Sequence, residues 1–164
     1  MIPGTRTAAL TAAALLTAAS AVGVTHSAQA APLTPTCTAA DLRLSLGQEE
    51  YAAGSIFIPV NFTNTSTRVC SLRGYPGVSV LDAGHQQIGS PATHSSSPAT
   101  TVSVNPGQTV SATIRTNNAA VAPACRPLPD YIGIYAPASF QQVLLPYQLL
   151  ICGAFETSPV QVAG

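Results

Sequence analysis

Apolar residues alternate with polar ones along several stretches of this chain. A period of two places alternate side chains on one face of a strand, so each stretch is typical of a β-strand with one buried face. A sustained helical period is missing from the chain after residue 31, and the 14 prolines come too often for long helices. We therefore predict an all-β protein. The alternating apolar residues are Leu42, Leu44 and Leu46; Ile56, Ile58, Val60 and Phe62; Val78 and Val80; Val102 and Val104; Val110 and Ile114; and Ile132 and Ile134.

Residues that favour turns separate these stretches. Tyr75–Val78 and Asn105–Gln108 both have Pro-Gly at the centre. This predicts type II turns, because proline presets φ at the first central position and glycine accepts a positive φ at the second. Asp82–His85 predicts a hairpin connection, and Asn64–Ser66 predicts a turn between two further strands. Pro59 lies inside a strand pattern, and we expect it at a sheet edge or a bulge because it cannot donate to the ladder.

The spacing of strands and turns indicates the architecture. Roughly seven to nine short strands with these turns favour an immunoglobulin-like, antiparallel, two-sheet β-sandwich. A small closed β-barrel is the alternative, because short antiparallel strands with the same alternation also build barrels.

Residues 1–30 have the organisation of a secretory signal peptide. A basic start at Arg6 is followed by an apolar run and by small residues that fit the A-x-A cleavage rule. We place the cleavage between Ala30 and Ala31, which leaves residues 31–164 as a single all-β domain with no membrane span. A membrane anchor is the alternative, but the apolar run is shorter than the about 20 residues that cross a bilayer.

The four cysteines all follow the predicted cleavage site. An exported domain should have them oxidised, and four cysteines can pair in three ways. We favour Cys37–Cys70 and Cys125–Cys152, where each bond closes a loop of about thirty residues and contributes roughly 3–4 kcal/mol. A redox or zinc site would need closely spaced cysteine pairs, which this chain lacks.

One block of residues is more specific than a strand pattern. Residues 70–78 read Cys-Ser-Leu-Arg-Gly-Tyr-Pro-Gly-Val, with Asn-Phe-Thr-Asn-Thr at 61–65 and Leu-Asp at 81–82. With these motifs the chain, from about Cys37 to Cys152, resembles the family catalogued as domain of unknown function 4232, found in secreted actinobacterial proteins. The resemblance implies an exported, disulfide-bonded, all-β domain, and it carries over no activity and no catalytic residues.

The charge of the chain excludes some partners. The chain has no lysine, and removal of Arg6 leaves five arginines against six acidic residues. A chain this close to neutral does not attract nucleic acid or anionic lipid electrostatically. We therefore expect no nucleic-acid partner.

Candidate catalytic and metal-binding residues are few. His85 falls in a predicted turn and His94 in a Ser/Thr/Pro-rich loop, so we expect neither to bind a metal. Gly77–Leu81 lacks the second glycine of the serine hydrolase motif. A glycoside hydrolase needs two facing carboxylates, and no motif indicates such a pair. We predict a non-enzymatic protein without a cofactor or metal. The acidic residues of the predicted mature chain are Asp41, Glu49, Glu50, Asp82, Asp130 and Glu156.

Two surface features suggest binding. Tyr131 and Tyr135 would share one strand face, opposite Ile132 and Ile134, and an exposed tyrosine row can bind sugar or protein. Ser90–Thr101 is dense in hydroxyls and proline, which is typical of an O-glycosylated stretch. The alternative for this segment, which we favour, is a flexible surface loop.

These observations leave the function unknown but narrow its class. We predict a secreted, extracellular or cell-envelope interaction module that is either free or associated with the cell wall. Its partner would be a cell-wall glycan or an extracellular protein. A carbohydrate-binding module and a cell-wall hydrolase are the alternatives.

Overall fold

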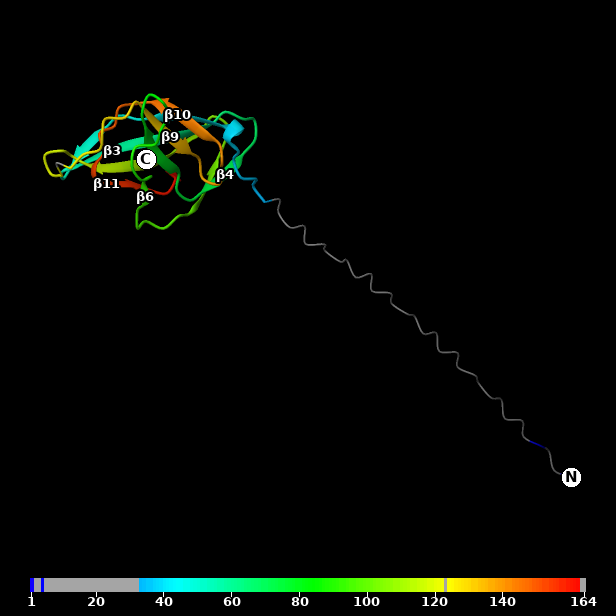
Figure 1. The fold of residues 1–164 in the computed structure, drawn as a ribbon. Coiled ribbons are helices and arrows are strands. Elements are labelled where there is room, and N and C mark those ends of the chain that lie inside the picture. Colours follow the sequence, from blue (N-terminus) through cyan, green and yellow to red (C-terminus); the bar gives the residue numbers. More distant parts are fainter. Residues whose placement is uncertain (2–3, 5–32, 123, 163–164) are drawn as a thin grey trace. The chain divides into compact units, whose positions relative to one another are not determined.

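Strands account for nearly all the regular structure of this protein. The computed structural model describes Met1, Gly4 and residues 33–122 and 124–162, and Leu33–Gly164 forms one compact unit (Figure 1). The predicted signal segment and its cleavage site, Ala30 and Ala31, lie outside the described residues. The strands are β1 Leu42–Leu46, β2 Glu50–Ala52, β3 Ser55–Asn64, β4 Cys70–Arg73, β5 Gly77–Leu81, β6 Thr93–His94, β7 Thr101–Val104, β8 Thr109–Asn117, β9 Tyr131–Tyr135, β10 Gln142–Pro146, β11 Cys152–Thr157 and β12 Gln161–Val162.

The strands form three separate sheets, of which the third is a single two-stranded ladder. The large sheet has seven strands in the order β1-β3-β8-β11-β6, with β2 also paired to β3 and β12 to β8. The small sheet has the order β10-β9-β5, and β4 pairs with β7 in a third ladder. Figure 1 shows β9 and β10 lying across from β3 and β11. The predicted β-sandwich is confirmed, and the alternative of a closed barrel is wrong. One pair departs from the predicted antiparallel pattern, because β6 runs parallel to β11.

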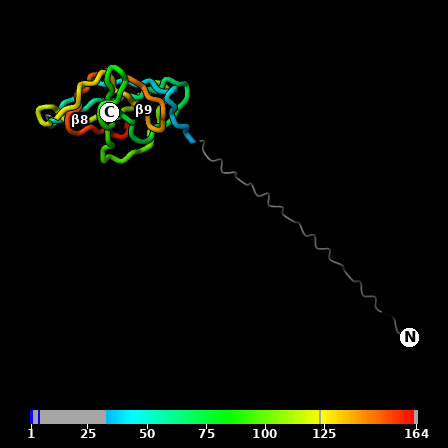
Figure 2. The backbone as a smooth tube through the Cα atoms, viewed as in Figure 1, coloured from blue at the N-terminus to red at the C-terminus, as the bar shows by residue number. Residues whose placement is uncertain are grey.

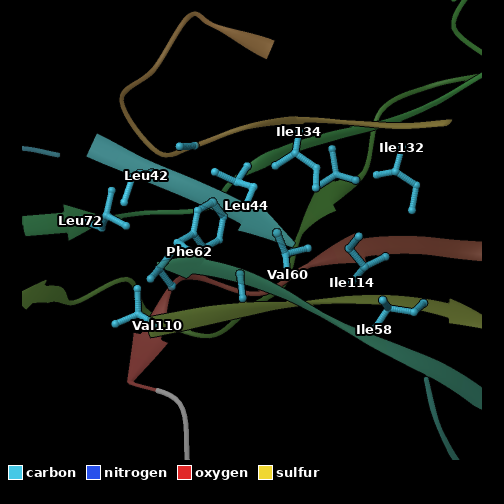
Figure 3. Close-up of a cluster of buried hydrophobic side chains, with 14 of the residues drawn as sticks. Leu42, Leu44, Ile58, Val60, Phe62, Leu72, Val110, Ile114, Ile132 and Ile134 are labelled. Atoms are coloured by element: carbon cyan, nitrogen blue, oxygen red, sulfur yellow. The ribbon is translucent and has the colours of Figure 1, made fainter. Parts of the chain in front are cut away.

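The core lies between the sheets and contains the residues that the alternation places inward. On β3 the side chains of Ile58, Val60 and Phe62 are fully buried, while the residues between them are partly exposed. Figure 3 shows Ile132 and Ile134 of β9 across from Val60 and Ile114 of the large sheet. Burial of each such side chain contributes about 1.5–3 kcal/mol, so these strands stabilise each other through their inner faces.

Pro59 lies on a strand that has partners on both sides, so of the two predicted places the sheet edge is wrong. The pairing beside it shifts by one residue, from Leu46 with Val60 to Glu50 with Phe57, which agrees with the other prediction, a bulge. β3 pairs with β8 on one side and with β1 and β2 on the other. β1 ends at Leu46 and β2 begins at Glu50, so the partner strand is interrupted beside Pro59. The carbonyl of Pro59 accepts a hydrogen bond from the amide of Gly47 at 2.8 Å. The missing proline amide therefore lies on the side of the gap between two short strands and not on the side of β8.

The two Pro-Gly sequences behave differently. Gly107 has φ +77, and the amide of Gln108 donates to the carbonyl of Asn105 at 2.9 Å, which confirms the type II turn there. The prediction for Tyr75–Val78 is wrong, because Gly77 opens β5 and pairs with Tyr135. The positive φ of that block belongs to Gly74, at +112.

The Gly74 bend changes the pairing of the chain. β4 ends just before this glycine and pairs with β7, whereas β5 begins after Pro76 and pairs with β9. The positive φ of Gly74 and the missing amide of Pro76 together interrupt the ladder between the two strands. This block, the most specific part of the family resemblance, is therefore where one length of chain passes from the third ladder to the small sheet.

The predicted turn at Asp82–His85 is present, and the carbonyl and carboxylate of Asp82 accept its hydrogen bonds. The amide of His85 donates to the carbonyl of Asp82 at 2.9 Å, and the carboxylate of Asp82 accepts from the amides of Gly84 and Gln86. The positive φ in this turn is at His85, not at Gly84. The returning arm forms an isolated bridge between Leu81 and Gln87, and the amides of Ile88 and Ala92 donate to the carbonyls of Val80 and Val78, both at 2.8 Å.

Two disulfides fasten the segments that lie outside the ladders. Cys37 is bonded to Cys70 and Cys125 to Cys152, which is the pairing that the sequence favours. The first bond attaches the arm before β1 to the start of β4. The second attaches the connection between β8 and β9, the yellow loop in Figure 2, to the start of β11.

A single turn of 3-10 helix, Ala39–Asp41, precedes β1 and was not predicted. The carboxylate of Asp41 accepts hydrogen bonds of 2.7 Å from both the amide and the hydroxyl of Thr38, and it pairs with Arg68 at 3.1 Å. These hydrogen bonds, together with Arg68, lower the pKa of Asp41 to about 2 although burial opposes the shift. Within the described part of the chain, no helix has the length and apolarity needed to cross a membrane.

Candidate binding site

The outer face of the small sheet carries the two predicted tyrosines. Tyr131 and Tyr135 are half-buried on β9, while Ile132 and Ile134 point inward. Gly133 lies between the tyrosines on the same face, because residues two apart on a strand share a face. We call the surface of Tyr131, Gly133 and Tyr135 the tyrosine face. The structure therefore places the tyrosine pair on one face, as their spacing predicts.

The space between the two tyrosines is filled. A Cβ built on Gly133 would lie 2.8 Å from Cδ1 of Leu81 and would also meet the side-chain amide of Gln142. Tyr135 covers Gly77 of β5 in a similar way, with its Cβ 3.4 Å from a Cβ built on that glycine. The side chains of Gln142 and Leu81 therefore fill the space over Gly133 between the two tyrosines.

A strained loop extends this surface. The chain between β9 and β10 contains Ala138, which has φ +61 although it is not glycine. The side chain of Phe140 in the same loop is fully exposed, at 101%. Beside this loop is a shallow depression of about 620 Å³ that is lined on its other side by Thr36–Ala39. We call residues 136–141 the Phe140 loop. The loop adds an aromatic ring to the same end of the hairpin as Tyr135.

Sequence reasoning missed Phe140. Its stretch has no alternation that would mark it as inward or outward, and the exposure of its ring follows from the loop conformation. A phenylalanine between Ser139 and Gln141, outside any strand pattern, was the one available signal.

The histidines make aromatic contacts. The ring of His85 meets Tyr131 edge to face at a centroid distance of 4.9 Å, and His94 stacks on Tyr75 at 4.2 Å. Among the residues that the structure describes, no three His, Cys, Asp or Glu side chains gather as they would around a metal ion.

The Ser/Thr/Pro-rich segment lies on the surface, and hydrogen bonds attach it to the body. The hydroxyl of Tyr75 donates to the carbonyl of Ser97, and the amide of Ser95 donates to the carbonyl of Thr157 at 2.9 Å. Just before these anchors, β6 pairs with β11. O-glycosylation of Ser90–Thr101 stays a prediction.

Four acidic side chains have structural partners. Asp41 and Asp82 bond to the helix and turn described above, and Glu156 pairs with Arg115 at 3.1 Å. Glu49 accepts hydrogen bonds from the hydroxyls of Tyr51 and Tyr147, the second at 2.7 Å. Burial, and then the bond to Glu49, raise the pKa of Tyr147 above its ordinary value. These carboxylates hold loops and strands in place.

Comparison with known proteins gives one finding on the family. The family model described as "Domain of unknown function (DUF4232)" matches residues 37–162, which include both disulfides and β1 to β12. No curated protein matches the chain.

Proposed function

The chain belongs to the DUF4232 family, a domain of unknown function, and from this premise we propose that it is a secreted module that binds a protein partner outside the cell or in its envelope. The two disulfides support the location, because such bonds persist in oxidising compartments. The Phe140 loop and the adjoining tyrosine face would form the binding surface.

The exposure of Phe140 is the observation that carries this proposal. Burying a phenylalanine side chain is worth about 1.5–3 kcal/mol, and here the whole ring is left in water. A partner with a complementary pocket gains that free energy on binding. Aromatic anchors of this kind provide most of the binding energy at many protein interfaces.

The backbone of the loop supports the same conclusion. An alanine in the left-handed region costs about 1–2 kcal/mol relative to ordinary conformations. Ala138 keeps this conformation at +61, and the amide of Ser139 donates to the carbonyl of Ala136 at 2.9 Å, which closes the turn. Strain of this sort gathers at binding loops, because it presents a side chain in a fixed position before the partner arrives.

The partner is a protein in preference to a glycan for a structural reason. A sugar ring stacked between the two tyrosines would have to lie over Gly133, where Gln142 and Leu81 already occupy the space. The hydrolase alternative draws no support from the acidic residues, because four of them are engaged in the structural contacts described above.

Co-sedimentation with cell walls tests the proposal. The oxidised mature chain is mixed with purified walls of its source organism, before and after wall proteins are stripped. We expect sedimentation with intact walls, loss of it with stripped walls, and an at least about tenfold weaker association of Phe140→Ser. Leu128→Ser is the matched control, because Leu128 is 54% exposed in the connection between β8 and β9.

Two outcomes would overturn the proposal. Retention on stripped walls that does not depend on Phe140 would indicate a glycan ligand bound elsewhere. Equal association of Phe140→Ser and wild type with intact walls would remove the Phe140 loop from the binding surface. Both variants should unfold at the urea concentration of wild type, because each changes a side chain that contacts water.

A further inference from the structure

The two disulfides differ in where they lie relative to the core. Cys37 and Cys70 both belong to the cluster of buried apolar side chains that forms the core, and they are 3% and 0% exposed. Cys152 is also buried, at 1%, but neither it nor Cys125 belongs to that cluster, and Cys125 is partly exposed. The second disulfide therefore lies beside the core, and Cys125 is its end nearer to water.

Backbone hydrogen bonds hold Cys125 and Cys152 opposite each other. The two residues form an isolated antiparallel bridge, and one hydrogen bond flanks it on each side. These bonds run from the amide of Arg126 to the carbonyl of Ile151, at 2.8 Å, and from the amide of Gly153 to the carbonyl of Ala124, at 3.4 Å. The cysteines thus occupy a non-hydrogen-bonded pair of positions, where facing side chains come closest in an antiparallel ladder.

Other contacts keep both cysteines in place without the disulfide. The amide of Cys152 donates to the hydroxyl of Thr116 at 3.1 Å, and this hydroxyl donates to the carbonyl of Cys152 at 3.2 Å. Thr116 is fully buried on β8, a central strand of the large sheet. Arg126, which follows Cys125, donates through Nη1 to the carbonyl of Ser90 at 2.6 Å. Opening of this disulfide should therefore leave the protein folded and the two cysteines near each other.

The exposure of its two ends decides how a disulfide reacts with a thiol. A thiolate attacks one sulfur and displaces the other, so the rate depends on which sulfur it can reach. In the second disulfide Cys152 is the buried end, and Sγ of Cys125 is therefore the sulfur that an external thiolate meets first. The first disulfide has no such end, because both of its cysteines are buried in the core.

We propose that Cys125 is a reversible modification site for a small thiol. The thiolate forms a new S–S bond with Sγ of Cys125. The bond to Cys152 breaks, and its electron pair leaves with Sγ of Cys152, which takes up a proton. The products are a mixed disulfide at Cys125 and a free thiol at Cys152, so no further oxidant or reductant is needed.

The pairing of the two cysteines makes the modification reversible. Because the flanking hydrogen bonds keep Cys152 opposite Cys125, its thiol attacks the mixed disulfide and restores the original bond once the small thiol is removed. This inference does not rest on the proposed protein partner, since it concerns covalent chemistry in the connection between β8 and β9. A protein that fails to sediment with walls could still be modified here.

Peptide mapping after a short exposure to a thiol tests the inference. The oxidised secreted protein is incubated with excess L-cysteine, quenched at intervals with excess N-ethylmaleimide and cleaved before aspartate without a reductant. The cleavage sites that place each of the four cysteines on its own peptide are Asp41, Asp82 and Asp130. At the earliest times we expect an added cysteine on Cys125 and a maleimide on Cys152. Both should appear at least about tenfold faster than any change in the first disulfide.

Three results of the mapping would contradict the proposal. Equal rates for the two disulfides would mean that both are reached only when the whole protein unfolds. An added cysteine found mainly on Cys152 would place the attack at the other sulfur. No modification of Cys125 while circular dichroism shows a folded protein would exclude the site altogether.

Two matched variants separate access to the sulfur from loss of the bond. Cys125→Ala and Cys152→Ala remove the same disulfide, and each leaves one free thiol. The thiol of Cys125 in Cys152→Ala should react with an aromatic disulfide reagent at least about tenfold faster than the thiol of Cys152 in Cys125→Ala. Equal rates would show that burial does not protect Cys152, and the assignment of Cys125 would be wrong. Reversibility is checked in wild type, where the original bond should return after L-cysteine is removed, and a persistent mixed disulfide would contradict it.

Discussion

The outer faces of the two sheets carry different kinds of side chain, although the inner faces of their strands carry similar ones. On the large sheet the outward residues of β3 and β8 include Asn61, Thr63, Ser111 and Thr113, all partly exposed. On the small sheet the corresponding residues of β9 are those of the tyrosine face. Both sets of strands bury valine and isoleucine inward. The inner positions therefore hold the sheets together, and the outer positions distinguish what each sheet can contact.

The two outer faces should also differ in how well they tolerate substitutions. On the large-sheet face, Asn61, Thr63, Ser111 and Thr113 are short polar residues that contact water, and the hydroxyls of Thr63 and Thr109 on neighbouring strands share a hydrogen bond of 2.8 Å. The tyrosine face is packed, because Gln142 and Leu81 occupy the space that a side chain at Gly133 would need. A substitution on the tyrosine face should therefore cost more stability than a similar substitution on the outer face of the large sheet, which we call the polar face.

Gly133→Val is the substitution that tests this contrast most strongly. Valine would displace the side chains of Leu81 and Gln142, and Leu81 is now 5% exposed, so apolar surface returns to water. We expect a loss of about 1–3 kcal/mol in the free energy of unfolding, as for other overpacked sites. Urea unfolding measures it.

Two companions sharpen that measurement. Gly133→Ala should cost less, because both groups that it meets are ends of flexible side chains. Ser111→Val, at a partly exposed outward position of β8, should change stability by no more than about 0.5 kcal/mol. Gly133→Val and Ser111→Val of equal stability would show that the two faces do not differ in packing.

The inward half of each strand could be predicted from the sequence, and the outward half only in part. A period of two identifies Val60 and Phe62 as core residues without any knowledge of their partners. It does not say which strand lies alongside, so the sequence could not decide whether Pro59 lies at an edge or beside a bulge. Pro59 lies on central β3, opposite the gap between β1 and β2. Residues 74–77 contain two glycines, either of which could form a bend, and the structure shows that Gly74 is the one with a positive φ.

The candidate surfaces show the same limit. Tyr131 and Tyr135 could be paired from spacing alone, because four residues along one strand return to the same face. The pairing of Phe57 with Arg115 could not be predicted, because the two residues meet only through the register of two strands that are distant in the chain. A local sequence pattern predicts which residues of one strand share a face. A site made by several strands can be predicted only when the pairing of those strands is known.

Low pH should destabilise β1, at the edge of the large sheet, more than it destabilises β9 of the small sheet. Asp41 holds the start of β1 through Thr38 and Arg68, whereas β9 of the small sheet relies on buried isoleucines. The pKa of Asp41 falls from 3.8 to about 2 on folding. A lowered pKa means that the contribution is present above about pH 4 and is lost as pH falls through 2; its size is at most about 2 kcal/mol.

Urea unfolding of wild type and Asp41→Asn between pH 5 and pH 2 checks this prediction. The stability difference between the two proteins should be largest at pH 5 and should shrink toward the acid end, because wild type loses there what the variant never had. Hydrogen exchange at low pH should show amides of β1 losing protection before those of β9. A constant difference across the pH range would mean that Asp41 acts through packing and not through its charge.

The smallest expected effect concerns the polar face itself. Thr63→Val removes one hydroxyl of the bond between Thr63 and Thr109 and keeps the β-branched shape that suits a strand. Because both residues are partly exposed, water can replace the lost partner, and we expect a cost of about 0.5 kcal/mol.

A double-mutant cycle with Thr109→Val isolates this bond. The coupling free energy between the two positions should be about 0.5 kcal/mol, and the double variant should be about as stable as either single variant, because no hydroxyl is then left without its former partner. A coupling several times larger would mean that the polar face is as tightly constrained as the tyrosine face. In that case the two faces would not differ in their tolerance of substitutions, and a substitution at Gly133 would be costly only because Leu81 and Gln142 cover that position.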